Sequence, residues 1–313
     1  MTENTEYGRI IKGIGGLYTV LTKNRALSCR ARGIFRHEND SPRVGDIVSV
    51  KNEDGSYVIE KILPRKNLFM RPPLANVDFL FCVIPCASPQ PDIFTLDKLI
   101  SISESLSCEP VIVVTKSDLD AENASRIMSI YSKAFQTFLT SSCNNTGTDE
   151  LLGFIERNSK NSVFAFAGAS GAGKSTLMNK LFPCLSISTQ SVSRKISRGR
   201  HTTRHVELFP LRTLGAEADG FIADTPGFSM LDFERFDFYD VEQLPLFFRE
   251  FSGYLGKCRY KGCTHLCEQG CAIVEAVEKN EIPKSRHESF VALYNVLKNK
   301  NKWDKKHSYQ SSR

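Results

Sequence analysis

A glycine-rich segment between an apolar run and a helical run is the strongest chemical signal in the sequence. It follows VFAFA and precedes TLMNKLF. That order of strand, loop and helix is typical of a phosphate loop, whose backbone N–H groups cradle a phosphate at the positive end of a helix. Lys174 would then bridge the β- and γ-phosphate oxygens, and Ser175 would hold Mg²⁺. The predicted phosphate-binding residues are Gly168, Ala169, Ser170, Gly171, Ala172, Gly173, Lys174, Ser175 and Thr176.

The tetrapeptide Asp224-Thr-Pro-Gly227 lies downstream of this loop and directly follows the apolar run GFIA. The Asp224 carboxylate would reach Mg²⁺ through water, and the Gly227 N–H would meet the γ-phosphate. In isolation, DxxG is a common turn. Its place after a phosphate loop is what indicates the sensor side of a nucleotide switch.

A third segment, Thr115-Lys116-Ser117-Asp118, directly follows the apolar run VIVVT and has the residue types that recognise guanine. The Asp118 carboxylate would accept bonds from the N1–H and the amine of the base, and the Lys116 stem would cover its face. A backbone N–H near Ser141-Ser142-Cys143 would donate to the carbonyl oxygen of the base. Thr115 stands where the NKxD motif has Asn, so we expect weaker base affinity or weaker packing on the phosphate loop. The predicted base-binding residues are Thr115, Lys116, Ser117, Asp118, Ser141 and Ser142.

Cysteine and histidine crowd the segment CRYKGCTHLCEQGC, which holds four of the ten cysteines of the chain. In a cytosolic protein such crowding indicates a metal rather than disulfides. Thiolates and an imidazole form the soft tetrahedral set that suits Zn²⁺, and a site closed by four protein ligands is structural, not catalytic. Spacing alone leaves Cys267 as a competing thiol. The candidate ligands are Cys258, Cys263, His265, Cys267 and Cys271.

The elements that must position these motifs begin with short β-like pieces over residues 7–64, divided by turn signals. This pattern predicts a small barrel of the oligonucleotide-binding type, with an SH3-like barrel as the alternative. From FLFCVI onward, apolar strands alternate with helical stretches at 92–107, 122–134 and 149–158. The alternation predicts a parallel sheet covered by helices.

Beyond Phe233 the pattern has no strand-like alternation. Helical stretches follow the cysteine segment at 272–279 and 288–300, so we expect a small helical module. The basic stretch from Lys298 onward predicts a frayed tail.

Composition and charge limit what the whole chain can be. Its 313 residues are 41% hydrophobic and 24% charged, which excludes a mostly disordered or collagen-like chain. No apolar run reaches the roughly 18 residues of a membrane span, and the first residues lack the blocks of a signal peptide, so we expect a cytoplasmic protein without a membrane partner. The net charge of +6 is concentrated in residues 1–71 and 236–313. Basic flanks suit contact with a polyanion, and excesses this small also suit ordinary solvated surface.

The order of the motifs is informative, because the base-reading segments at 115–118 and 141–143 precede the phosphate loop instead of following it. A GTPase module in this order is circularly permuted. A barrel precedes it, a Cys/His cluster follows it, and Gly199-Arg-His-Thr-Thr203 lies between the phosphate loop and DTPG. This combination resembles the ribosome small subunit-dependent GTPase A family, bacterial assembly factors of the 30S subunit, over nearly the whole chain.

The resemblance implies a multidomain fold. An oligonucleotide-binding-like β-barrel would occupy residues 1–69, a circularly permuted α/β P-loop GTPase residues 70–233, and a small helical zinc-binding domain with a basic tail residues 234–313. The resemblance leaves Cys267 out of the metal site. The zinc ligands it implies, one ion per chain, are Cys258, Cys263, His265 and Cys271.

The resemblance also assigns the switch residues. Thr203 would coordinate Mg²⁺ together with Ser175 and sense the γ-phosphate, with Thr202 as the alternate. Phe228 follows DTPG, where many GTPases place a water-orienting Gln, and the family's proposed substitute is His201. A phosphate-contacting or merely solvated histidine is the alternative for His201. The implied catalytic residues are His201, Lys174 and Thr203.

The implied function is a GTPase that hydrolyses GTP to GDP and phosphate, binds the 30S subunit and its 16S rRNA as a monomer, and assists late small-subunit maturation with ribosome-stimulated activity. A competing hypothesis is an rRNA-binding module in which nucleotide serves mainly as a conformational switch with little turnover. The intact residues Lys174, Ser175, Asp224 and Thr203 argue against that module, whereas Thr115 and the missing Gln leave room for it. A third hypothesis, an ATP-using P-loop enzyme, would require that Asp118 only cap the end of its strand.

Overall fold

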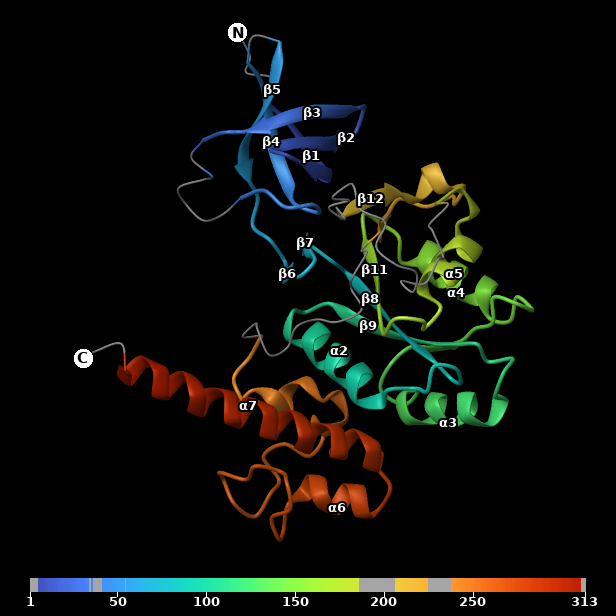
Figure 1. Ribbon diagram of the computed structural model, residues 1–313, viewed down its shortest axis with the longest axis vertical. Coiled ribbons are helices and arrows are strands. Elements are labelled where there is room, and N and C mark those ends of the chain that lie inside the picture. Colours follow the sequence, from blue (N-terminus) through green and yellow to red (C-terminus); the bar gives the residue numbers. More distant parts are fainter. Residues whose placement is uncertain are drawn as a thin grey trace, which may run out of the picture.

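The computed structural model describes residues 5–33, 35, 41–53, 55–185, 206–224 and 238–310, with residues 300–310 described by backbone alone. Three parts follow one another along the chain. Figure 1 shows a barrel, then a sheet between helices, then a helical module beneath it. None of the helices in the described ranges pairs the length with the apolar character that crossing a bilayer requires.

Five strands form the barrel: β1 (Thr5–Ile14), β2 (Leu17–Thr22), β3 (Ala26–Ala31), β4 (Ile47–Glu53) and β5 (Ser56–Ile62). Their order is β1-β2-β3-β5-β4, and β4 pairs back onto β1, which closes the barrel. β3 and β5 are parallel and the other pairs antiparallel. The predicted five-stranded barrel is confirmed, and its interior is apolar, with Ile10, Val20, Val48 and Ile59 fully buried.

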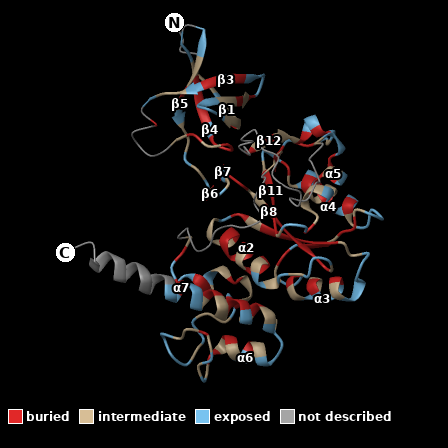
Figure 2. Cartoon of the chain, in the orientation of Figure 1, coloured by how far each residue is buried: buried red, intermediate tan, exposed pale blue. Residues whose placement is uncertain are grey.

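The central sheet contains β8 (Phe79–Pro85), β9 (Glu109–Thr115), β10 (Thr137–Leu139), β11 (Val163–Ala167), β12 (Glu207–Pro210) and β13 (Phe221–Asp224). Its order is β10-β9-β8-β11-β13-β12, and every pair is parallel except β12 with β13. Figure 2 shows that its central strands are buried along most of their length. The strands read as continuous apolar runs because helices cover both faces of the sheet.

Four helices cover the sheet: α2 (Ile93–Ser105), α3 (Ala121–Tyr131), α4 (Thr148–Arg157) and α5 (Lys174–Leu181). On β8, Leu80 and Cys82 join the core under α2 and α3, and Phe81 and Val83 join the core under α4 and α5. Asp92 caps α2 by accepting a bond from the Thr95 N–H. The predicted parallel sheet and its helices are confirmed, with helix ends shifted by a few residues.

Two short pieces of backbone connect the barrel to the sheet. The hairpin β6 (Leu68–Met70) and β7 (Pro73–Ala75) lies on the connecting segment, and an isolated bridge joins Leu74 to Val44. β12, which was not expected from the sequence, pairs with both β13 and β1. Barrel and central sheet therefore form one continuous eleven-stranded sheet.

Side chains of β1 reinforce this connection. The Arg9 guanidinium donates to Asn161 O at 3.1 Å and lies over the Phe221 ring at 5.2 Å from its centroid. Lys12 Nζ lies 2.7 Å from Glu207 Oε2. This ion pair is partly open to solvent, because the Lys12 and Glu207 side chains are 40% and 31% exposed.

The C-terminal module consists of short 3₁₀ turns, the cysteine segment and two helices. Its elements are η3 (Leu244–Phe247), η4 (Arg249–Phe251), α6 (Ala272–Glu278) and α7 (Lys284–Gln310); η1 (Pro183–Leu185) and η2 (Leu211–Leu214) belong to the central part. α7 packs along α2 of the central part. The predicted helical module is confirmed, and no strand occurs between residues 238 and 310.

The last helix is longer than predicted at both ends. We expected a helix at 288–300 and a frayed tail, whereas α7 begins at Lys284 and continues to Gln310. It begins directly after Pro283, whose carbonyl accepts the Arg286 and His287 N–H groups. The basic stretch contains neither proline nor glycine, so nothing in it stops the helix.

A fully buried arginine fixes α7 to the central part. Arg286 Nη1 lies 2.6 Å from Asp97 Oδ1 on α2, and its Nε lies 2.7 Å from Glu250 Oε1. The Tyr131 hydroxyl of α3 also donates to Asp97, and the Arg286 guanidinium lies 4.6 Å from the Phe248 ring centroid. Burial alone would lower the pKa of Arg286, but the two carboxylates raise it well above its usual value.

Candidate nucleotide site and metal centre

The predicted phosphate and base segments lie at one edge of the central sheet. β9 leads into Lys116, β11 into Gly168, and β13 ends at Asp224. These strands are parallel, so their carboxyl ends meet at the same edge. Ligands of open α/β sheets bind outside that edge, where the chain order changes direction. Here the change falls between β8 and β11, next to the phosphate loop.

The phosphate loop requires glycine at two positions. Gly168 has φ +149°, and a Cβ there would lie 2.2 Å from the Val83 carbonyl oxygen. Gly173 has φ +91° and is the N-cap of α5, so the unpaired N–H groups of the first helical turn point toward the loop. The first turn of α5 contains no acidic residue. The loop can therefore accept an anion at its helix end.

Lys174 lies within this loop. Its Nζ donates to Gly168 O at 2.7 Å and to Ala169 O at 2.8 Å. Burial lowers the pKa of the Lys174 ammonium to about 8. A phosphate in the loop would raise this pKa again, because a nearby opposite charge favours the charged form.

Two side chains tie the base segment to the phosphate loop. The buried Thr115 hydroxyl donates to Ala172 O at 2.6 Å. Lys116 Nζ donates to Gly171 O at 3.0 Å and also to Ser88 O in the loop before α2. We expected Thr115 to weaken either the base affinity or the packing on the phosphate loop, and its hydroxyl forms a direct bond to that loop. Its effect on base affinity stays a prediction.

The remaining base-segment residues lie around this contact. Asp118 is exposed two residues after Lys116. After β10, Ser141 is fully buried; its N–H donates to Thr146 O at 3.0 Å, and its hydroxyl accepts from the Cys143 N–H at 3.2 Å. The Ser141 and Cys143 N–H groups are therefore already bonded within the turn. Of the three predicted donors to the base carbonyl, this leaves the Ser142 N–H.

Asp224 ends β13 beside the phosphate loop strand. Burial, followed by the negative charge of Glu207 on β12, raises the pKa of its carboxyl group. Several predicted switch residues lie outside the described residues: His201, Thr202, Thr203, Gly227 and Phe228.

The predicted metal ligands come together in the C-terminal module. Cys258, Cys263, His265 and Cys271 place their four ligand atoms within 4.8 Å of one another. The Cys258 and Cys271 sulfurs are 3.9 Å apart, and each lies 3.5 Å from His265 Nδ1. Zn–S bonds of about 2.3 Å in a tetrahedron put sulfurs about 3.8 Å apart, so the cluster fits a tetrahedral metal site. Cys267 is exposed and lies outside it.

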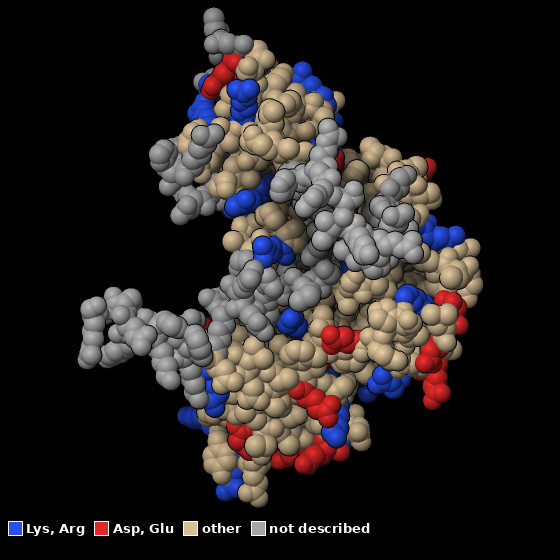
Figure 3. Space-filling model, in the orientation of Figure 1, with Lys and Arg blue, Asp and Glu red and all other residues tan. Residues whose placement is uncertain are grey.

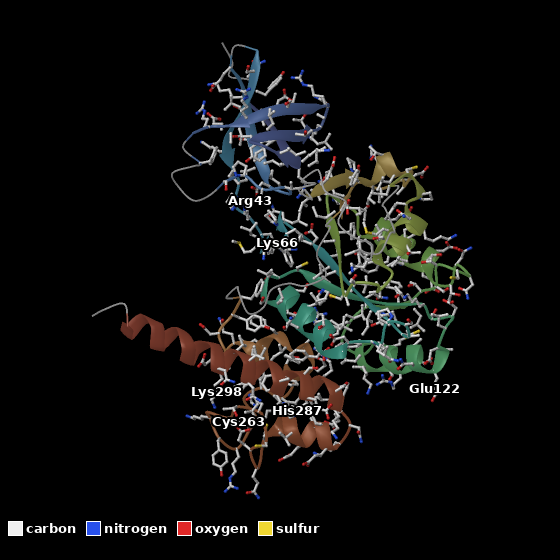
Figure 4. All side chains as sticks on the ribbon, in the orientation of Figure 1. Arg43, Lys66, Glu122, Cys263, His287 and Lys298 are labelled. Atoms are coloured by element: carbon white, nitrogen blue, oxygen red, sulfur yellow. The ribbon has the colours of Figure 1, made fainter. Side chains whose placement is uncertain are left out.

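The segment between Cys258 and Cys271, the metal loop, is held by its own backbone and by α7. The Glu268 carboxylate accepts bonds from Thr264 and from the Leu266 and Cys267 N–H groups. Burial opposes its ionisation, but these bonds lower the pKa of Glu268 to about 2. His287 of α7 bonds to His265 O at 2.7 Å, and Figure 4 places His287 beside Cys263. Burial also lowers the pKa of His265, which favours the neutral, ligating imidazole.

Comparison with models of known protein families shows which family the chain belongs to. A model described as the RsgA N-terminal domain matches residues 7–58, and one described as RsgA GTPase matches residues 62–234. The chain belongs to the RsgA GTPase family. It is therefore a GTP-hydrolysing enzyme, and the recognised resemblance is confirmed.

RsgA relatives match along almost the whole chain. Proteins named small ribosomal subunit biogenesis GTPase RsgA from Caldanaerobacter subterraneus and Clostridium beijerinckii are 38% and 39% identical to it, over 94% and 95% of this chain and 97% and 99% of theirs. The solved structure of YjeQ from Thermotoga maritima has a TM-score of 0.78 at 30% identity, covering 94% of this chain and 98% of its own. That of YloQ, described as a circularly permuted GTPase, has a TM-score of 0.75 at 32% identity, with 95% and 96% covered.

Sequence reasoning missed three contributors to these sites in the RsgA-family chain. Ser88 offers only a backbone carbonyl, which no residue type signals. Glu207 and Lys12 are ordinary surface residues by sequence, and only the pairing of β12 brings Glu207 next to Asp224 and Lys12 next to Glu207. The one available hint was the short apolar run LFP after Glu207, which is too short to predict a strand.

Proposed function

We propose that this chain is a GTPase of small ribosomal subunit biogenesis, whose hydrolysis of GTP to GDP and phosphate is stimulated when it binds the 30S subunit and its 16S rRNA. The observation that carries the nucleotide assignment is the direct bonding of the base segment, through Thr115 and Lys116, to the phosphate loop. The relatives' printed name supports the ribosomal role. We further propose a monomer that acts in the cytoplasm during late maturation, with domains at 1–69, 70–233 and 234–313.

In the proposed binding mode, each group meets one part of the nucleotide. Asp118 accepts from the guanine N1–H and amine, and the Ser142 N–H donates to the guanine carbonyl oxygen. Lys174 has three donors, of which two are bonded within the loop, so the third can meet a phosphate oxygen. The phosphate-loop N–H groups surround the β-phosphate.

Mg²⁺ fits the hard oxygen donors at this edge, which are the hydroxyl of Ser175 and the carboxylate of Asp224. We propose that Thr203 adds a second hydroxyl. The ion would neutralise charge that develops on the phosphate oxygens. We keep His201 as the proposed water-orienting residue.

Lys174→Ala and Asp118→Asn test the nucleotide assignment. Lys174→Ala should abolish GTP turnover, because it removes the ammonium that would bridge the β- and γ-phosphate oxygens. Asp118→Asn should lower GTP affinity and shift preference toward xanthosine nucleotide, since an amide cannot accept both base protons. Phosphate release from GTP measures the turnover of the Lys174 variant. Competition of GTP, ATP and xanthosine triphosphate measures the preference of the Asp118 variant, and an unchanged preference would refute the guanine site.

His201→Ala tests the hydrolytic role. If His201 orients the attacking water, GTP binding should stay within a few fold while 30S-stimulated hydrolysis falls by a factor on the order of 10² or more. Equal losses in binding and hydrolysis would mark His201 as a switch-ordering residue instead.

The ribosomal partner is supported by the charge distribution. Figure 3 shows Lys and Arg side chains on the barrel and along the hollow beneath it, with most acidic side chains toward the central and C-terminal parts. Phosphate release from GTP, measured with and without purified 30S or 50S subunits, tests the partner. Stimulation by 30S alone is expected. Binding of 30S without any turnover would favour the alternative, an rRNA-binding module with nucleotide as a switch.

We propose that the metal is a single structural Zn²⁺. Three thiolates and one neutral imidazole are the donor set that this ion prefers, and four protein ligands leave no open position. Elemental analysis of the purified chain tests the identity of the metal, and one zinc per chain is expected.

A further inference from the structure

Three charged residues lie in a row where the barrel meets the central sheet. Lys12 of β1 pairs with Glu207 of β12, and Glu207 lies directly opposite Asp224 of β13. Directly opposite residues on neighbouring strands share one face of the sheet. Lys12 Nζ lies 2.7 Å from Glu207 Oε2. One ammonium and two carboxylates therefore follow one another across three strands.

A β-bulge in β1 allows Lys12 to reach this row. The register of β1 against β2 shifts between Ile10 and Lys12. In a regular strand Lys12 would share the face of Ile10, which is fully buried inside the barrel. Bulges redirect side chains in this way. The barrel is therefore built to present this ammonium to β12.

The contact between Lys12 and Glu207 is too exposed to contribute much stability, since both side chains are about a third accessible or more. The charges of this pair nevertheless act on the nearby Asp224 carboxylate. The Glu207 carboxylate lies opposite Asp224 on the neighbouring strand, so it adds negative potential at the end of the site where the metal is expected. Lys12 offsets that potential from the barrel side.

We propose that Lys12 is a positioning residue contributed by the barrel, which sets the charge beside Asp224 through Glu207 and so tunes how tightly the GTPase site holds Mg²⁺ with GTP. This inference rests on the proposed function, because it needs Mg²⁺ and GTP at this edge of the sheet. Coupling of this kind is reciprocal. A partner that pulls β1 away from β12 would change metal affinity, and metal binding would change how firmly the barrel docks.

Opposite single substitutions test the proposal. Lys12→Met leaves Glu207 uncompensated and should lower the Mg²⁺ concentration for half-maximal binding of a fluorescent nonhydrolysable GTP analogue by about two- to fivefold. Glu207→Gln leaves an unpaired ammonium and should raise that concentration by about the same factor. These factors correspond to one unit charge acting on a divalent ion across about 10 Å in a medium close to water.

Three further variants serve as controls. Lys12→Arg keeps the charge and should behave as the wild-type chain does. The double variant Lys12→Met/Glu207→Gln removes both charges and should return the Mg²⁺ requirement to near the wild-type value. Lys23→Met removes the same net charge from the exposed turn between β2 and β3, remote from Asp224, and should not change the requirement.

The outcomes separate a charge effect from a structural one. Shifts of opposite sign that cancel in the double variant support the proposal. Shifts of the same sign in both single variants, or a Lys12→Met shift no larger than that of Lys23→Met, overturn it while leaving the GTPase assignment intact. A wild-type chain that binds no GTP analogue at any Mg²⁺ concentration would overturn the proposed function, and this inference with it.

Discussion

The central GTPase part is joined to its two neighbours in physically different ways. The barrel junction at β12, made by Arg9 and Lys12 of β1 with Asn161, Glu207 and Phe221, is polar and partly exposed. The C-terminal junction is made by the fully buried Arg286 network and by a second arginine, Arg249, which bonds Glu104 and Glu109. Aromatic rings enclose Arg286 on several sides.

This difference indicates which parts move together. A fully buried ion pair cannot open without leaving a charge unpaired in the core, which is costly. A partly exposed pair exchanges its partner for water at little cost. We therefore expect the GTPase part and the C-terminal module to behave as one unit, with the barrel as the part that can change its position.

The largest effect should come from removing the metal. Cys263→Ser should lose the proposed zinc, with a binding free energy on the order of 10 kcal/mol coupled to folding of the module, and residues from about 238 onward should loosen. Cys267→Ser is the matched control and should keep its zinc. Elemental analysis and limited proteolysis measure both effects. Zinc retained in the Cys263 variant and lost from the Cys267 variant would show that the thiols are wrongly assigned.

Breaking the buried arginine network should have the next largest effect. Arg286→Met leaves Asp97 and Glu250 without their cation and should lower the free energy of unfolding by about 3–5 kcal/mol. Adding Asp97→Asn and Glu250→Gln to it should recover part of that loss. Denaturant unfolding of both variants provides the measurement. A loss below about 1 kcal/mol in the single variant would contradict the tight C-terminal junction.

Hydrogen exchange should rank the two junctions within the unmodified chain. Amides of α2 and of the buried part of α7 should exchange only with opening free energies close to the global value. Those of β12 should exchange through local opening at a free energy lower by about 2 kcal/mol or more. Native-state exchange at increasing denaturant measures this. Equal opening free energies in β12 and α7 would remove the distinction between the junctions.

The smallest effect should come from the barrel junction. Arg9→Ala should lower the free energy of unfolding by no more than about 2 kcal/mol, because its guanidinium bonds only the Gly45 and Asn161 carbonyls and its loss leaves no carboxylate unpaired. Thermal unfolding compared with Lys23→Met, which lies outside the junction, checks this. A loss as large as that of Arg286→Met would mean that the two junctions are equally tight.

Much of the fold was predictable because its signals are local. The phosphate loop, the metal loop and the alternation of strands with helices each occupy a short stretch whose residue types dictate its geometry. Gly168 and Gly173, for example, are required by backbone conformation and by a close approach to β8. The roles of residues such as Asp118 and Ser142 toward a nucleotide stay predictions.

The junctions were not predictable, because they depend on pairs that are far apart in the sequence. The sequence neighbours of Arg286 do not mark it as a buried residue. Arg286 can be buried only because Asp97 and Glu250, which lie on other elements, pair with it. Lys12 and Glu207 likewise become partners only through β12, a four-residue strand that tertiary pairing stabilises. The longer α7 was missed because its first turn was not assigned to the start after Pro283, and because the basic stretch at its end was expected to fray although it contains no helix-breaking residue.

The continuous sheet also protects the protein from self-association. The edge strand β10 has only three residues, but β12 would be an open edge of the central sheet if β1 did not pair with it. Open edges offer unpaired N–H and C=O groups to other chains. β1 pairs with this edge at Glu207, so we expect the barrel to shield the edge from other chains. A chain shortened to begin after β5 should expose that edge and form oligomers or aggregates at concentrations where the full chain does not.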